Sequence, residues 1–213
     1  MNNTRKHLLK DHAYTLLKTR IMDGDFNPGT FLSERQLAAQ LGMSKTPIRA
    51  ALERLDVEGF VSVSPQQGVI VREMSVQEVN DLYDLRIALE TFVMRRVAGR
   101  LNEGQVRQLQ DFIDEQYQQV PGKTVAEYRG LDADFHLTLC AFANNNEILR
   151  VMKHQRERLT HIITNVLKRV PERMTVGINE HVTILQVLVD GDGEMAARLM
   201  QTHLENGKRI LLG

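Results

Sequence analysis

A change of hydrophobic periodicity near residue 60 constrains the fold of this chain more than any other feature of its sequence. Up to Gly59, apolar residues recur at helical spacing in three short segments. Residues 60–63 and 69–71 then form two β-rich runs around the turn-forming letters SPQQG. After Val71, helical spacing returns and continues to the last residue. Three helices followed by one hairpin indicate a winged helix-turn-helix in residues 1–72.

Local signals mark where the N-terminal helices begin and end. The first helical stripe covers residues 11–23 and runs into the turn formers GDFNPGT. Ser33 is a suitable N-cap for a second helix that closes at Gly42. Ser44 is a suitable N-cap for a third helix, which ends at Gly59 and has Pro47 in its first turn, where a missing N–H is tolerated.

The rest of the chain, residues 73–213, predicts a second domain built only of helices. Short breaks rich in Gly, Asn, Asp and Pro separate the helical segments, and Asn144 is suited to a left-handed helix end. Short connections favour an antiparallel bundle. The fold class is therefore mainly α, a winged helix-turn-helix joined by a short linker, residues 72–78, to a six-helix bundle. The six helices are expected at 76–100, 103–119, 124–143, 146–169, 172–189 and 193–211.

Composition narrows the classes of protein. The single cysteine, Cys140, excludes a disulfide within the chain and is typical of a reducing compartment. No apolar run approaches the ~18 residues of a membrane-spanning helix, and the first residues do not resemble a signal peptide. We therefore expect a cytoplasmic protein without a membrane partner. Residues 1–72 carry ten Lys and Arg against seven Asp and Glu (+3), and residues 73–213 carry 17 against 20 (−3). A polyanionic partner would accordingly bind the N-terminal domain.

The third helix has the polar start that a DNA-recognition helix needs. Such a helix enters the major groove with its N-terminal residues at base edges, while other contacts to phosphates fix its position. Its first residues, from Ser44 to Arg49, provide hydroxyls, cations and a helix N-terminus. Arg35, in the first turn of the preceding helix, and Gly68, in the hairpin, are placed to reach the same duplex. Alternatively, Arg35, Lys45 and Arg49 are only a solvated face.

Four side chains of the second domain have the spacing of a metal site. Asp132 and His136 are four residues apart and share one helix face. His181 and His203 lie on the last two helices, equally far from residue 192 in the turn between them, so an antiparallel hairpin brings them to the same height. One carboxylate and three imidazoles suit a divalent transition metal. The alternative is that the histidines are surface or core residues with no shared ligand.

The residues from Pro28 to Val71 resemble the DNA-binding domain of GntR-type regulators. The matching pieces are LSERQLAAQLG, S-K-T-P-I-R-x-A-L-x-R-L and the G-F-V-x-V…G-V-x-V wing. Many members have Arg where this chain has Lys45, and Glu where it has Ala50, and a lysine cannot make the bidentate contact to guanine. The resemblance implies operator contacts for Arg35, Ser44, Lys45, Thr46, Arg49 and Gly68.

Residues 78–212 resemble the FCD effector domain found in one branch of that family, in its shorter form. The matching pieces are DLYDLRIALE, LDADFHLTLCAFANNNEIL and NEHVTILQVLVDGDGEMAARLMQTHLENG. The resemblance implies a metal held by Asp132, His136, His181 and His203. It also implies that Arg86 meets the carboxylate of an effector. From the residues alone, Arg86 could equally be an ion-pair partner within the bundle, with Glu90 one turn away.

These observations predict a homodimeric transcription regulator rather than an enzyme. Two winged helices related by a two-fold axis would read a palindromic operator in double-stranded DNA. A small carboxylate metabolite at the metal would change operator affinity, with residues 72–78 transmitting the shift. Zinc is the first choice of metal, with nickel, manganese or iron as alternatives. The alternatives are a metal-dependent enzyme, for which no general base is evident, and a structural protein. Effector, operator, regulated genes and sign of regulation stay open.

Overall fold

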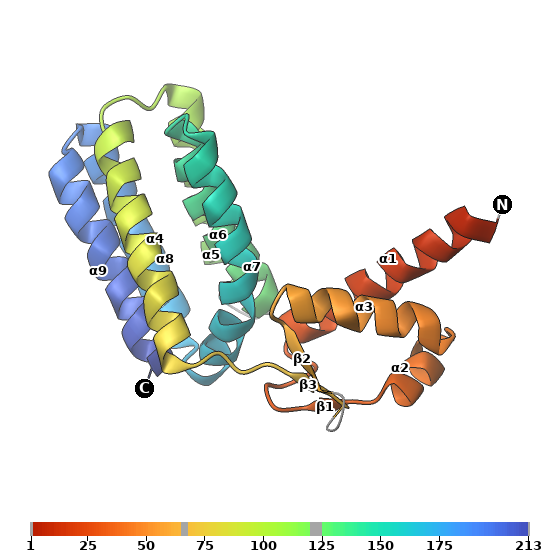
Figure 1. The fold of residues 1–213 in the computed structure, drawn as a ribbon. Coiled ribbons are helices and arrows are strands. Elements are labelled where there is room, and N and C mark those ends of the chain that lie inside the picture. The colour runs from red at the N-terminus through yellow and green to blue at the C-terminus, as the bar shows by residue number, and fades with distance from the viewer. Residues whose placement is uncertain (1, 65–67, 120–124, 213) are drawn as a thin grey trace. The chain divides into compact units, whose positions relative to one another are not determined.

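The computed structural model describes residues 2–64, 68–119 and 125–212, and it divides the chain into two compact units, Met1–Met74 and Ser75–Gly213 (Figure 1). The division falls two residues beyond the border at 72 expected from the sequence. The turn residues 65–67 and the whole VPGK break, residues 120–123, lie outside the described residues. None of the described helices is long and apolar enough to cross a membrane.

The first unit is a three-helix domain with a small antiparallel sheet. Its core is formed where α1 packs against α3, with Leu17, Ile21, Ile48, Leu52 and Leu55 fully or almost fully buried. The strand order is β1-β3-β2, so that the hairpin strand β3 is central. The elements are α1 (Asn2–Met22), β1 (Phe31–Leu32), α2 (Glu34–Leu41), α3 (Lys45–Val57), β2 (Val61–Ser64) and β3 (Gly68–Val71).

Most local signals act as the sequence predicts. The Ser33 side chain accepts a hydrogen bond from the Gln36 backbone N–H at the start of α2, and Gly42 ends that helix at φ 62°. Two predictions were wrong. Helix α1 begins at Asn2 rather than residue 11, because polar residues can extend a helix beyond its buried stripe. Strand β1 was not predicted, because two residues carry no periodic pattern and form a strand only by pairing with β3.

The described residues of the second unit form six helices. The α8–α9 turn contains Gly191 at φ 86°, and Asn144 takes the expected left-handed conformation at φ 50°. Figure 1 shows α4 and α9 side by side, and this pair has the most extensive contact in the unit. Helix α5 packs on α6 and α8, and α6 also packs on α7. The helices are α4 (Val76–Val97), α5 (Glu103–Gln119), α6 (Val125–Phe142), α7 (Asn146–Arg169), α8 (Glu172–Asp190) and α9 (Gly193–Leu212).

Helix α4 begins at residue 76 as expected, but the linker and the far end of the helix correct the sequence prediction. Ser75 and Glu78 form a reciprocal capping box, so residues 76–78 of the expected 72–78 linker are the first helical turn. The helix was expected to reach residue 100 but ends at Val97. Gly99 has φ 67°, and its N–H donates to the Leu188 carbonyl of α8 (2.8 Å), which stops the helix by a tertiary contact.

Candidate metal centre and DNA-binding surface

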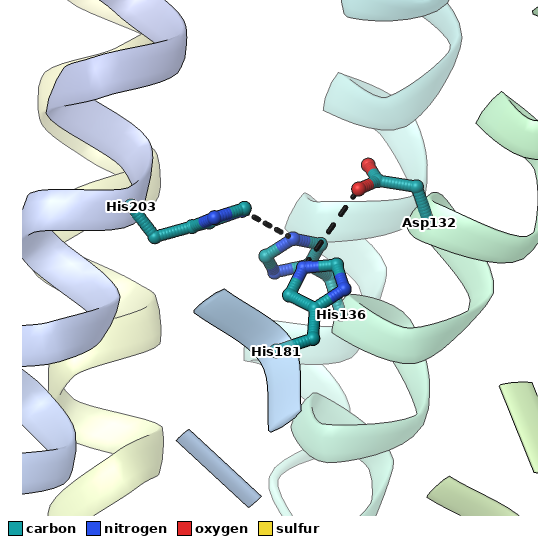
Figure 2. A group of neighbouring side chains, drawn as sticks. All are labelled: Asp132, His136, His181 and His203. Atoms are coloured by element: carbon teal, nitrogen blue, oxygen red, sulfur yellow. Dashed lines mark hydrogen bonds and ion pairs between the residues drawn. The ribbon is translucent and has the colours of Figure 1, made fainter. Parts of the chain in front are cut away.

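Four side chains from three helices converge inside the second unit. Figure 2 shows Asp132 and His136 on α6 facing His181 of α8 and His203 of α9. One donor atom from each of the four lies within 4.8 Å of the others. The three imidazoles are buried, and the Asp132 side chain is 16% exposed. The structure therefore brings together all four residues that the sequence pattern selected.

The convergence follows from helix geometry. Residues four apart lie on one face of α6, so Asp132 and His136 project in the same direction. The turn at Gly191 reverses the chain, and the rings of His181 and His203 meet with their centroids 4.7 Å apart. The symmetry of these two histidines about residue 192 thus becomes a shared height in the bundle.

The ring nitrogens that face one another are the Nε2 atoms. The Nε2 atoms of His136 and His203 are 3.3 Å apart, and Nε2 of His181 lies 3.7 Å from Asp132 Oδ1. The His181 Nε2 atom is buried and has no hydrogen-bond partner among the described residues. A buried nitrogen without a partner is costly unless something else binds it.

Each imidazole is held from behind through its Nδ1 atom. His136 Nδ1 lies 2.5 Å from Glu90 Oε2, and His203 Nδ1 lies 2.7 Å from Glu180 Oε2. An ionised carboxylate only accepts hydrogen bonds, so both Nδ1 atoms carry a proton, and in the neutral form of each ring the Nε2 atom then presents a lone pair. His181 Nδ1 lies 3.3 Å from the Gln116 carboxamide oxygen, which is again an acceptor. None of these three partners was singled out from the sequence as a histidine partner.

The electrostatics favour neutral rings at His181 and His203 and ionised carboxylates at Glu90 and Glu180. Burial, and then the charges of the neighbouring histidines, hold the pKa of His181 well below its usual value. Burial also lowers the pKa of His203, although its hydrogen bond to Glu180 opposes this. Burial disfavours the charged form of Glu90, but the charges of Arg86 and His136 outweigh it and lower the pKa of Glu90 to about 2. His181 and His203 are therefore in the protonation state that a metal ligand requires.

This donor set fits a divalent transition metal. Three unprotonated nitrogens and one carboxylate oxygen are typical ligands of zinc and of similar ions, and hydrogen bonds on the far side of each ring fix its tautomer. Two lone pairs 3.3 Å apart repel each other unless a cation lies between them. Asp132, His136, His181 and His203 are the residues that would hold the ion.

Arg86 lies on the wall of two cavities next to this cluster. Its Nε donates to Glu90 Oε1 over 2.5 Å, so the ion pair considered from the sequence is present, within α4. Even so, Arg86 and Asp132 line both cavities. The first is walled mainly by apolar and aromatic side chains, together with polar groups near the cluster. Its lining includes Tyr83, Tyr128, Leu167, Arg173, His203 and Leu204.

The residues predicted to contact DNA lie at the surface of the first unit. Arg35, Ser44, Lys45, Thr46 and Arg49 are all exposed. The Ser44 hydroxyl makes no capping hydrogen bond within α3, and Lys45, Thr46 and Arg49 line one shallow depression. The structure thus groups the polar start of α3 on one exposed face.

Two of these residues have roles within the domain as well. Arg49 donates from Nε and Nη2 to both carboxylate oxygens of Glu34 (3.0 and 2.9 Å), which leaves its Nη1 for a further acceptor. Gly68 has φ 82°, and a Cβ there would lie 2.5 Å from the Phe31 ring. The Phe31 ring is exposed and can move aside, so the left-handed backbone is the second reason for glycine at that position, beside the expected approach to DNA.

Comparisons with known proteins agree with this architecture. The family model described as "Bacterial regulatory proteins, gntR family" matches residues 9–71, and the model described as "FCD domain" matches residues 81–206. The chain belongs to the GntR family, in its FCD branch. The two matched segments coincide with the two structural units.

Curated relatives of this GntR-family chain are transcription regulators, not enzymes. The HTH-type transcriptional repressor RspR of Escherichia coli K12 is 27% identical over 200 residues, covering 92% of this chain and 86% of RspR. The Nta operon transcriptional regulator of Aminobacter aminovorans is 36% identical over 135 residues, 63% of either chain. The gluconate operon transcriptional repressor of Bacillus licheniformis is 33% identical over 136 residues, covering 63% of this chain and 55% of that one.

Solved structures confirm the fold. A GntR-type regulator from Rhodococcus sp. RHA1 superposes with a TM-score of 0.77 at 24% identity, covering 96% of this chain and 97% of that one. The Escherichia coli protein McbR/YncC gives the same TM-score at 22% identity, with the same coverage. The mainly helical class and the pairing of a winged helix-turn-helix with a helical FCD domain are thereby confirmed.

The sequence analysis did not single out Arg173, a further cationic side chain that lines the first cavity of this GntR-family chain. Arg173 of α8 donates through Nη2 to Glu180 Oε2 (2.7 Å) and to the His203 carbonyl oxygen (3.2 Å). Its Nη1 is buried without a partner among the described atoms, and the side chain is 10% exposed. The only sequence signal was the spacing of seven between Arg173 and Glu180, which puts both on one helix face.

Proposed function

We propose that this GntR-family regulator binds a palindromic operator as a homodimer and that a small carboxylate, bound at a metal in the FCD domain, changes its operator affinity. The observation that carries the proposal is the convergence of three imidazole Nε2 atoms and the Asp132 carboxylate beside a cavity that contains Arg86.

Zinc is the metal proposed first, with nickel, manganese and iron as alternatives, because a three-nitrogen, one-oxygen donor set accepts each of them. When bound, such an ion supplies a Lewis acid with coordination positions left for an oxygen ligand. The protein's own residues fix the imidazoles, exclude bulk water and place cationic groups nearby.

The effector is proposed to be a carboxylate because the cavity offers donors for oxygen ligands. The Arg86 guanidinium is buried and lines the space beside Asp132. Arg173 adds an N–H donor that lacks a partner among the described residues. An unpaired buried donor is satisfied when a ligand oxygen reaches it. The apolar walls, which include Leu167 and Leu204, would contact the carbon skeleton of the ligand.

On the DNA side, we propose that α3 is the recognition helix. Arg35, Ser44, Lys45, Thr46 and Arg49 would contact phosphates and base edges, and the hairpin with Gly68 would contact the duplex beside them. Two copies related by a two-fold axis would read two half-sites. The relatives RspR and the gluconate regulator are named repressors, which favours repression of chromosomal targets in the cytoplasm.

An α4 surface supports the homodimer. Leu85 and Phe92 lie seven residues apart on one face of α4 and are 43% and 45% exposed. Residues seven apart form one stripe along a helix, and apolar stripes of this kind are typical of helix-to-helix contacts. We propose that a second copy of the chain covers this stripe.

Metal analysis of the purified full-length chain tests the proposed centre. The wild type is expected to retain close to one equivalent of a divalent metal, and His136→Ala is expected to lose it because one of three imidazole ligands is gone. His154→Ala is the matched control, since His154 is exposed on α7 and outside the cluster. Equal metal content in the wild type and His136→Ala would remove the metal centre from the proposal.

Fluorescence anisotropy with fragments from the neighbouring intergenic DNA tests the regulatory half. Operator binding is expected to weaken steeply with salt, since phosphate contacts release counterions. A saturating carboxylate effector is expected to change the operator Kd by about 5–150-fold, the usual range of allosteric coupling. An operator Kd that is the same with and without the bound effector would refute the allosteric part, and an absence of DNA binding would refute the whole.

A further inference from the structure

The FCD-domain cluster is backed by two chains of contacts with the same order of groups. In the first, Arg86 of α4 donates to Glu90 Oε1, and Glu90 Oε2 accepts from His136 of α6. In the second, Arg173 of α8 donates to Glu180 Oε2, which also accepts from His203 of α9. Each chain therefore runs from a cavity arginine through one carboxylate to one histidine.

Each carboxylate lies against the Nδ1 atom on the far side of one histidine ring. Glu90 is fully buried, with one oxygen on the arginine and one on the imidazole. Glu180 has its second oxygen, Oε1, on the Asn206 side-chain amide (2.9 Å). Both glutamates are thus fixed by two or more donors and cannot rotate away without leaving a buried donor unpaired.

We propose that Glu90 and Glu180 are positioning residues, each of which orients one histidine toward the metal and one arginine toward the effector cavity. The inference rests on the metal centre proposed above. Glu90 fixes His136 and Arg86, and Glu180 fixes His203 and Arg173. The geometry that the metal needs and the geometry that the carboxylate needs therefore depend on the same two side chains.

The third histidine of the cluster, His181, has a carboxamide rather than a carboxylate at its Nδ1 atom. The Nδ1 atom of His181 lies 3.3 Å from the neutral carboxamide oxygen of Gln116, a longer contact than those of the other two histidines with their carboxylates. Among the described residues, this series of contacts includes no arginine. The His181 ring is held additionally by stacking on Phe135, with centroids 4.2 Å apart. His136 and His203 also make ring contacts, with each other (centroids 5.2 Å apart) and, for His136, with Phe135 (5.8 Å), so what distinguishes them from His181 is the carboxylate on Nδ1.

The test compares zinc affinity in Glu180→Ala and Glu180→Gln, measured by competition with a chromophoric chelator on the full-length chain. Glutamine keeps an oxygen for His203 and Arg173, and Asn206 can turn its amide to match. Loss of an outer partner typically weakens metal binding by about 10–100-fold, so Glu180→Ala is expected in that range and Glu180→Gln below about tenfold. Glu194→Ala, which breaks an exposed pair with Arg95, is the matched control and should bind zinc like the wild type.

A double substitution tests the arginine half. Arg173→Met is expected to lower zinc affinity because Glu180 loses one of its donors. The loss should be smaller than in Glu180→Ala, because Glu180 itself remains in contact with His203 and Asn206. When Arg173→Met is combined with Glu180→Ala, the two losses of zinc affinity should be clearly less than additive, since both act mainly through the same carboxylate, although Arg173 also donates to the His203 carbonyl oxygen. Additive losses would overturn the shared-carboxylate arrangement.

Histidine NMR separates positioning from general loss of structure. In the zinc-loaded wild type, His136 and His203 should each show a protonated Nδ1 and a metal-bound Nε2. The Nδ1–H signal of His203 should disappear in Glu180→Ala, persist in Glu180→Gln, and leave that of His136 unchanged in both. The role of Glu90 is tested by the His136 signals of the wild type. A Glu90 variant is not used, because it would leave Arg86 as an unpaired buried charge and destabilise the fold.

The outcomes are distinct. A protonated Nε2 on His136 or His203, or equal zinc affinity in Glu180→Ala and the wild type, would overturn the roles of the glutamates and leave the metal centre standing. A wild type that binds no zinc, nickel, manganese or iron would overturn the centre itself and this inference with it. Whether the protein binds operator DNA at all is a separate measurement, and its outcome does not depend on either result.

Discussion

Acidification of the metal-free protein should unfold it earlier than its carboxylates alone would require. His181 and His203 are buried, and their pKa values lie below the usual value, first because burial disfavours the imidazolium and then because of the neighbouring histidines. The unfolded chain therefore takes up protons near pH 6.5 while the folded chain does not. Stability should be fully present above pH 6.5 and should fall as the pH drops below it.

The magnitude follows from linkage. For each histidine that stays neutral in the fold, stability falls by up to about 1.4 kcal/mol between neutral pH and pH 5.5, one unit below the unfolded pKa. His181 and His203 together give up to about 3 kcal/mol. That is a large part of the roughly 5–15 kcal/mol that a domain of this size commonly has. Glu90 and Glu180, whose pKa values are lowered to about 2, add their losses only below about pH 4.5.

The assay is urea unfolding of the full-length chain from pH 7.5 to 5.5, with a chelator present. Circular dichroism is the suitable signal because the chain contains no tryptophan. His181→Gln should remove a large share of the pH dependence, whereas His154→Gln, at an exposed position, should leave it unchanged. A free energy of unfolding that stays level, or rises, between pH 6.5 and 5.5 would refute the reasoning.

Four further outcomes are expected. Lys45→Ala should weaken binding to all DNA sequences and reduce the slope of log K against log salt by about one, measured by anisotropy, if this lysine contacts one phosphate. Arg86→Met should reduce carboxylate binding by the zinc-loaded protein in calorimetry at least tenfold, about the 1.4 kcal/mol lower limit for a charged hydrogen bond; unchanged affinity would exclude Arg86 from the site. Phe92→Asp should halve the mass seen by light scattering, and a persisting dimer would place the interface elsewhere. Gly68→Ala should lower the free energy of unfolding, measured in urea, by about 1–2 kcal/mol, because the backbone at this position is left-handed. The loss should be nearly the same in a Phe31→Ala background, because the Phe31 ring is exposed and can move aside.

Much of the fold was predictable because its signals are local. Ser33, Gly42 and Asn144 stop or start helices through the conformation of one residue and a hydrogen bond to a near neighbour. Such signals depend on adjacent residues alone. For this reason the six expected helices of the FCD domain agree with the observed ones to within three residues at each end.

The metal candidates were also predictable, since their placement follows from helical repeat. Asp132 and His136 share a face because they are four residues apart, and His181 and His203 meet because their helices are joined by a tight turn. Both relations follow from a fixed rise and rotation per residue along a helix.

What the sequence determined by itself is the order of the helices and the hairpin, most of their ends and the four residues that could share an ion. Only the tertiary structure decided which groups stand behind those residues. Glu90 meets His136 across 46 positions, Gln116 meets His181 across 65, and Glu180 meets His203 across 23. Such pairs depend on how far each helix is rotated about its own axis when it packs, and that rotation is set by the whole core rather than by any local pattern.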